Sequence, residues 1–184
     1  MTVSLPVTAP PLASRRLDLP PLTLAALEAL IMGDRQGLEA ATGARFPEPL
    51  TAPPLMEDAL PYFRDALRED PGAAPWWARL LILRETGDAV GSAGFTGGPD
   101  PEGTVTMGYS VYPAYQRQGI AAEAAAALLA WAIVQPGVRR VRAAIPPDHA
   151  ASQRVATHAG LRRTGLIEND PDEGPVEFWE HSQE

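Results

Sequence analysis

A strand, a short polar connection and an alanine-rich helix follow one another between residues 104 and 132, and this succession restricts the fold most. The strand is expected in "TVTMGYSVYP", and the polar connection "AYQRQG" leads into "IAAEAAAALLAWA". Small alanine side chains let a helix lie close to a sheet, and a helix packed on the strand before it is typical of α/β architecture. We therefore predict a helix that starts near Ile120, stops at Pro136 and packs on the preceding strand.

The rest of the chain divides into segments whose apolar periodicity predicts one mixed sheet. Helices are expected first, in "PLTLAALEALIM" with Thr23 as N-cap, in "DRQGLEAATG" ended by Gly43, and in "LPYFRDALRED". Further strands are expected at Leu17–Leu19 and in "WWARLLILRE", "GDAVGSAGF", "VRRVRAAIP", "LRRTGLIEN" and "PVEFWEH", with a helix in "DHAASQRVATHAG". The order predicts an α/β (α+β) fold with a mixed, mostly antiparallel sheet of six to seven strands and helices on both faces.

The start of the alanine helix carries hydrogen-bond donors suited to an anion. The first turn of a helix leaves backbone N–H groups unpaired at the positive end of the helix dipole. Gly119 lets a ligand approach the backbone closely, and Gln116, Arg117 and Gln118 add donors beside it. Phosphate or pyrophosphate fits such a site, although a plain strand-to-helix turn explains the same residues. A Walker A loop is excluded, because no Gly-Lys-Ser/Thr follows.

Composition excludes several classes of function. The 184 residues fit one domain, expected to span 1–184 with a flexible segment at 1–14, and they carry a formal net charge of −8. This charge argues against a nucleic-acid partner and is compatible with a cationic amine substrate. The chain has no cysteine, so no disulfide and no thiolate metal site is expected, and we predict no metal. We see no signal peptide and no apolar run long enough to cross a membrane, and we predict a cytoplasmic protein.

The connection and its surroundings resemble a known enzyme family. Gln116-Arg117-Gln118-Gly119-Ile120-Ala121 resembles the Gln/Arg-x-x-Gly-x-Gly/Ala signature of the GNAT superfamily of N-acetyltransferases. The stretches "SRRLDLPPLTLAALEAL", "MGYSVYPAYQRQGIAAEA" and "HAASQRVATHAGLRRTG" resemble other parts of that family, in order over nearly the whole chain. The resemblance is greatest to the branch that acetylates the N-terminal amines of ribosomal proteins. It implies transfer of an acetyl group from acetyl-CoA to a primary amine, on a sheet that is splayed in the middle.

The resemblance also implies which residues hold the cofactor. In the family, backbone amides of the loop bind the pyrophosphate, a role that falls on Gln118, Gly119, Ile120 and Ala121, with Arg117 as a side-chain helper. Pantetheine pairs with the strand before the loop, which ends at Val111, opposite Ala144 or Ile145. A backbone N–H near Val111 is then suited to the thioester oxygen. A homodimer is expected from the resemblance alone.

The sequence departs from the family where proton transfer is expected. Thr106 stands where many members carry a glutamate. Ala156 stands where many carry a tyrosine that acts as the general acid and protonates the thiolate. Ser152 is the remaining nearby hydroxyl, so we predict that it is the catalytic partner of the leaving thiolate and contacts the cofactor; alternatively it satisfies a helix backbone group. His149 stands in place of a family asparagine and is a candidate base or cofactor contact; alternatively it faces solvent at a helix start.

The acceptor amine is not specified by the sequence. Glu102, Glu177 and Glu180 are candidate amine-binding or basic groups. Alternation places Glu177 beside Trp179 on one strand face, which predicts either an amine pocket or, as we favour, a solvated edge strand. Arg139, Arg140 and Arg142 are expected at the solvated strand edge, unless one reaches the 3′-phosphate of CoA. Two other hypotheses stay open: a catalytically degenerate CoA-binding sensor or interaction module, and an unrelated phosphate-binding α/β protein.

Overall fold

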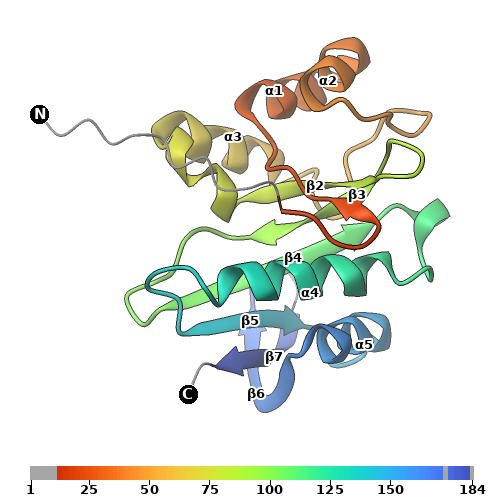
Figure 1. Cartoon of the computed structure of the whole chain (residues 1–184). Helices are drawn as coiled ribbons and strands as arrows, with labels where there is room; N and C mark the ends of the chain where they lie inside the picture. Colours follow the sequence, from red (N-terminus) through yellow and green to blue (C-terminus); the bar gives the residue numbers. More distant parts are fainter. Residues whose placement is uncertain (1–11, 172–173, 183–184) are drawn as a thin grey trace, which may run out of the picture.

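The computed structural model describes residues 12–171 and 174–182, and these residues build one sheet of seven strands (Figure 1). The order across the sheet is β1-β2-β3-β4-β5-β7-β6. The bounds are β1 Leu17–Asp18, β2 Ala78–Leu83, β3 Asp88–Phe95, β4 Thr104–Val111, β5 Arg140–Ile145, β6 Arg162–Asp170 and β7 Gly174–Ser182. The predicted fold class and strand number are confirmed. The predicted flexible segment at 1–14 falls mostly outside the described residues, and the Leu12 carbonyl accepts a hydrogen bond from the Leu19 N–H.

Strands β4 and β5 are parallel, whereas the other described neighbours in the sheet are antiparallel. The parallel contact covers three residue pairs, which join Thr104–Thr106 to Arg140–Arg142. Beyond these pairs, β4 keeps its partner β3 and β5 keeps its partner β7, but β4 and β5 no longer pair with each other. The sheet is therefore splayed between the carboxyl ends of β4 and β5, as expected.

Helices cover both faces of the sheet. Helices α4 (Ile120–Ala132) and α5 (Ala150–Ala159) lie in front of it in Figure 1 and share a core with β4 and β5. On the opposite face, α1 (Leu24–Met32), α2 (Arg35–Thr42) and α3 (Leu60–Glu69) share a second core with β2 and β3. Leu80 belongs to the second core and its neighbour Leu81 to the first, as the alternation of a strand requires.

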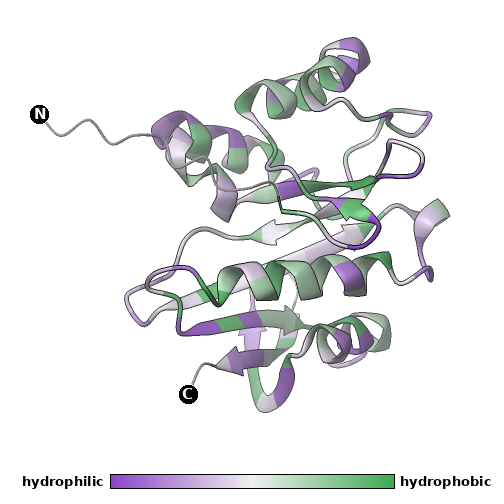
Figure 2. Cartoon of the chain, in the orientation of Figure 1, coloured by the Kyte–Doolittle hydropathy of each residue, from purple (hydrophilic) through white to green (hydrophobic). Residues whose placement is uncertain are grey.

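The alanine helix packs as its small residues predict. Ala124, Ala125, Leu128 and Ala132 of α4 are completely buried against the sheet. Figure 2 shows the apolar character of most of α4. Short side chains let the helix axis approach the sheet closely, because little volume separates the two backbones. This close packing determines where the first turn of α4 lies relative to the end of β4.

Two tryptophans lie outside the strand that was predicted to include them, because this strand begins at Ala78. Trp76 and Trp77 lie in and directly after the 3-10 turn Pro71–Trp76, whose prolines favour a turn over a strand. The Trp76 ring contacts that of Trp131 on α4, with centroids 4.7 Å apart. The Trp77 ring contacts Tyr62 and Phe63 of α3, so the pair links the two cores.

The backbone of β2 approaches β3 so closely that Gly94 has no room for a side chain. A Cβ on Gly94 would collide with the Trp77 carbonyl oxygen and lie 2.9 Å from the Ala78 Cα. We expect Gly94→Ala to lower the free energy of unfolding by about 1 to 3 kcal/mol, since backbone atoms of a central strand would have to shift. Gly98→Ala is the matched control, because its nearest neighbour atoms lie 3.8 Å away. Urea denaturation of both variants checks this, and equal stabilities would contradict it.

Candidate active site

The opening between β4 and β5 has the start of α4 beside it. Both strands run in the same direction, so their carboxyl ends, Val111 and Ile145, lie at the same edge of the sheet. After β4 the chain forms a 3-10 turn, Pro113–Tyr115, and returns to α4 through an exposed loop, Gln116–Gly119. The Gln116 side-chain Nε2 donates to the Val111 carbonyl over 3.0 Å, which ties this loop to the end of the strand.

The loop has the backbone shape of an anion cradle. Arg117 and Gly119 both have positive φ, 62° and 76°, and Gly119 is the N-cap of α4. Alternating right- and left-handed residues make successive N–H groups converge on one point. No described side chain caps the first amides of α4. A left-handed conformation is unfavourable for arginine, so the backbone is strained at this residue. The strained residue lies directly before the amides that are available to a ligand.

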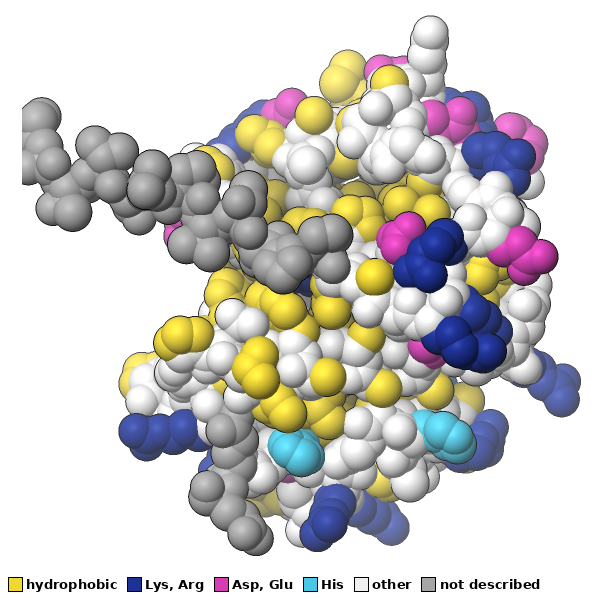
Figure 3. Space-filling view, viewed as in Figure 1, with side chains coloured by type: hydrophobic (Ala, Val, Ile, Leu, Met, Phe, Trp, Pro, Cys, Tyr) yellow, Lys and Arg dark blue, Asp and Glu magenta, His cyan; other side chains and the backbone are white. Residues whose placement is uncertain are grey.

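Arg117 extends from this loop into solvent, and the described residues include no ion-pair partner for it. Its charge therefore remains available beside the exposed loop. Figure 3 shows arginine side chains gathered at the side of this face where α4 begins. The residues predicted from the sequence, Arg117 to Ala121, are consecutive across the end of the loop and the first turn of α4, where the Ile120 side chain is buried in the core.

A hydroxyl pair bridges β4 and α5. The Tyr109 hydroxyl lies 3.0 Å from the Ser152 Oγ and donates to the Ser152 carbonyl over 3.0 Å. Burial raises the pKa of Tyr109, and its hydrogen bond to Ser152 offsets part of that rise. The phenol therefore holds its proton throughout the neutral pH range. Ser152 was predicted from the sequence, whereas its partner Tyr109 was not, because 43 residues separate them.

His149 is the N-cap of α5. Its Nδ1 accepts a hydrogen bond from the Ser152 N–H over 3.0 Å, and the ring is exposed. This agrees with the interpretation as an exposed residue at a helix start. The Nδ1 lone pair is engaged by this bond. Nε2 is the nitrogen left for a ligand.

The acidic candidates lie in three different environments. Glu102 is exposed in the turn before β4. Glu180 lies 3.5 Å from Arg140 and 3.7 Å from Arg142, whose guanidinium also stacks on Phe178. These two arginines are thus partly buried in ion pairs, which corrects the expectation of solvated strand-edge charges.

The prediction that Glu177 lies on a solvated edge strand is wrong. Strand β7 lies between β5 and β6, so β6 forms the edge and Glu177 is 1% exposed. Its carboxylate accepts from Arg163 Nε over 2.7 Å. The correction arises because the last strand inserts beside β5, a pairing that alternation within one strand cannot reveal.

The N-terminal segment fastens the start of α4. The Glu123 carboxylate accepts from the Arg16 Nε, the Arg16 backbone N–H and the Ser14 hydroxyl, each over 2.7 Å. Arg16 Nη2 also donates to the Gln118 carbonyl over 3.0 Å. Burial raises the pKa of Glu123, but the hydrogen bonds from Ser14 and Arg16 outweigh it, so the pKa lies below its ordinary value of 4.5.

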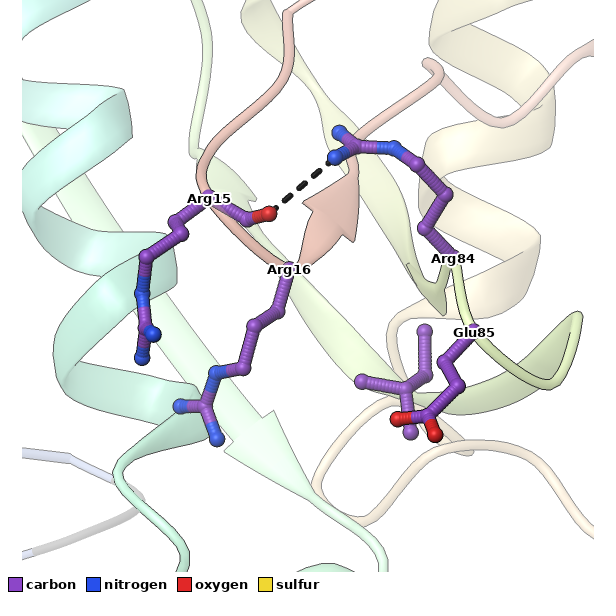
Figure 4. Close-up of a pocket in the computed structure, with 5 residues that line it drawn as sticks. Arg15, Arg16, Arg84 and Glu85 are labelled. Atoms are coloured by element: carbon purple, nitrogen blue, oxygen red, sulfur yellow. Dashed lines mark hydrogen bonds between the residues drawn. The ribbon is translucent and has the colours of Figure 1, made fainter.

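Beside this cluster lies a shallow surface hollow of about 280 Å³, lined by Arg15, Arg16, Leu83, Arg84 and Glu85 (Figure 4). Arg84 donates to the Arg15 carbonyl there, over 3.1 Å, and also pairs with Asp18 over 2.9 Å. Its guanidinium is therefore engaged in holding the N-terminal segment.

Comparison with known proteins agrees with this geometry. Residues 16–162 match the family model described as acetyltransferase (GNAT) domain. The chain belongs to the GNAT acetyltransferase family. The family predicted from the loop is thereby confirmed. The uncharacterized N-acetyltransferase YjdG of Bacillus subtilis is 30% identical to this GNAT chain over 112 residues, which are 61% of the chain and 64% of that relative. The matched region thus spans less than two thirds of the relative's length.

Solved structures share the fold of this GNAT chain. A ribosomal-protein-S5-alanine acetyltransferase from Vibrio fischeri superimposes with a TM-score of 0.63 at 14% identity, covering 95% of this chain and 97% of the other. RimL, a ribosomal L7/L12 alpha-N-protein acetyltransferase solved in complex with coenzyme A, gives 0.63 at 16% identity, covering 94% and 96%. None of the helices in the described part of the GNAT chain is long and apolar enough to cross a membrane.

The pairing of Arg16 with Glu123 predicts a pH-dependent contribution to the stability of this GNAT chain. We expect Glu123→Gln to lower the free energy of unfolding at pH 7 by about 1 to 3 kcal/mol, because charged hydrogen bonds of a half-buried carboxylate are lost. The lowered pKa means that this contribution is present above about pH 4.5 and is lost as the pH falls through the folded-state value. Denaturation between pH 3 and 7 checks this, and a difference from the wild type that stays constant with pH would contradict it.

Proposed function

We propose that the chain is an acetyl-CoA-dependent N-acetyltransferase that acetylates a primary amine. The observation that carries the proposal is the left-handed loop at the start of α4, placed beside an opened sheet in a member of the GNAT family. The proposal extends to a single domain over residues 1–184, to a cytoplasmic location and to a homodimer, the last from family resemblance alone.

In this proposal, different site residues bind different parts of the cofactor. The amides of Gln118, Gly119, Ile120 and Ala121 bind the pyrophosphate, and Arg117 adds its charge. The uncapped amides and the exposed loop support this assignment. Pantetheine lies in the opening between Val111 and the end of β5 at Ala144 and Ile145. His149 offers Nε2 at the start of α5, beside Ser152.

The chemistry requires three groups. The neutral amine attacks the thioester carbon, so that an N–C bond forms and the C–S bond breaks, while a backbone N–H near Val111 donates to the carbonyl oxygen. The leaving thiolate takes the proton of the Ser152 hydroxyl, and Ser152 takes that of the Tyr109 hydroxyl across their 3.0 Å contact. Water returns to Tyr109 the proton that the amine releases. Thr106 cannot act as a carboxylate base, Glu177 and Glu180 are held by arginines, and Glu102 precedes β4, at the opposite end of that strand from Val111. We therefore assign removal of the amine proton to water.

For the acceptor we propose a chemical class, a primary amine. RimL and the Vibrio fischeri neighbour are named for ribosomal proteins, which supports a peptide or protein N-terminus as the acceptor. A small-molecule amine is the other member of the same class. A net charge of −8 favours the approach of either acceptor in its protonated, cationic form.

Binding of the cofactor is the first test. We expect calorimetry to detect acetyl-CoA and CoA binding, and we expect CoA at one hundred times its Kd to stabilise the chain by about 2.7 kcal/mol. Gly119→Val, which puts a branched side chain on the left-handed N-cap, should abolish both effects. Simple nucleotides that bind as tightly as CoA would instead indicate an unrelated phosphate-binding protein. Free-thiol release with an amine and peptide panel then separates the transferase from the alternative, a CoA-binding module without catalysis.

The hydroxyl pair predicts a selective kinetic effect. We expect Tyr109→Phe to lower kcat roughly 100-fold with little change in the KM for acetyl-CoA, because general acid catalysis contributes on that order. Tyr112→Phe is the matched control: it removes another buried hydroxyl of raised pKa, which donates to the Thr51 carbonyl over 2.8 Å and lies outside the pair. Steady-state kinetics of thiol release checks both variants. Equal losses in the two would show that Tyr109 has only a structural role.

A further inference from the structure

Arg16 contacts the candidate cofactor loop from the far end of the chain, and its contact is with one particular peptide unit. Its Nη2 donates to the carbonyl of Gln118 over 3.0 Å. That carbonyl belongs to the peptide unit whose N–H is on Gly119. The carbonyl and N–H of a trans peptide point in opposite directions within one plane. A cation that holds the Gln118 oxygen on one side therefore directs the Gly119 N–H to the other side.

The loop needs such support because its backbone is unfavourable by itself. Arg117 and Gly119 flank Gln118 and both have left-handed φ values. A left-handed arginine costs free energy, and a peptide between two such residues can flip to more ordinary conformations. The bond from Arg16 acts on the peptide next to Gly119, where a flip would turn the amide away from a ligand.

Arg16 is itself held firmly. Its Nε and its backbone N–H both donate to Glu123 over 2.7 Å, and Ser14 donates to the same carboxylate. Arg84 fixes the backbone on both sides of Arg16, because its guanidinium donates to the Arg15 carbonyl (Figure 4) and to the Leu17 carbonyl, each over 3.1 Å. The charge of Arg16 is neutralised by Glu123, so its value to the loop lies in geometry rather than in long-range attraction of an anion.

We propose that Arg16 is a positioning residue for the pyrophosphate of CoA: it holds the Gln118 carbonyl so that the Gly119 amide faces the ligand. The inference rests on the proposed function, because it needs CoA on this loop. Glu123 supports this role, because it orients the Arg16 guanidinium. The two residues act through the Gln118–Gly119 peptide and through no contact of their own with the cofactor.

The test compares two ligands that differ in the 3′-phosphoadenosine of CoA and in the pyrophosphate that carries it. CoA contains both groups and pantetheine lacks both, so the Kd of CoA is measured by calorimetry and that of pantetheine by NMR titration to millimolar concentration. We expect Arg16→Met to weaken CoA at least tenfold and to leave pantetheine within about twofold. If the variant does not fold, Arg16→Lys replaces it, with a smaller loss of the same selectivity, because one ammonium cannot reach both partners.

Arg35→Met is the matched control. Arg35 has nearly the same side-chain exposure as Arg16, 32% against 33%. It likewise bonds carboxylates and backbone carbonyls, those of Glu39 and Glu48 and those of Phe46 and Pro47. It lies on α2, away from the loop, so its loss should leave the CoA-to-pantetheine affinity ratio unchanged. A wild-type chain that does not bind CoA would overturn the proposed function. A wild type that binds CoA, with an Arg16→Met variant that weakens both ligands equally or neither, would overturn the positioning role alone.

Glu123→Gln decides between positioning and simple electrostatics. The substitution removes a negative charge near the candidate pyrophosphate site, so electrostatics alone would tighten CoA binding. It also presents an amide N–H to a guanidinium or hydroxyl donor, which loosens Arg16 from its place. We expect the CoA Kd to rise several-fold in spite of the lost charge, with pantetheine unchanged. Tighter CoA binding in this variant would overturn the proposal.

Discussion

The three-residue parallel contact between β4 and β5 is the constraint on which the rest of the structure depends. Parallel neighbours cannot be joined by a hairpin, so the chain must cross over, and α4 is that crossover. The crossover begins where β4 ends, beside the place where the two strands separate. This one topological requirement thus places the opening between the two strands next to the N-terminus of a helix. In open α/β sheets, ligands bind outside the carboxyl ends of strands for this reason.

Contacts distant in sequence then hold this arrangement. The start of α4 is fastened by Ser14 and Arg16, more than 100 residues earlier, and the far side of the opening by the contact of Tyr109 with Ser152. The closely packed alanines of α4 leave its position little freedom. The candidate loop is therefore strained locally and supported from outside, which is how an unfavourable backbone persists at a functional site.

The features predicted correctly were local ones. The helix start at Ile120 and the cap at Thr23 depend on neighbours within a few positions, where helix capping rules apply. The family followed from the short loop before α4 together with the order of elements. The interior position of β7 and the burial of Glu177 were missed, because strand order depends on which edges meet in space.

The sequence by itself therefore determined the elements and their order, since periodicity, capping and small side chains act over one or two turns of chain. Only the tertiary structure decided that Tyr109 meets Ser152, that Arg16 meets Gln118 and Glu123, and that Glu177 is buried with Arg163. These contacts join residues from 14 to 107 positions apart. Their geometry follows from sheet order and helix packing, which no local pattern encodes.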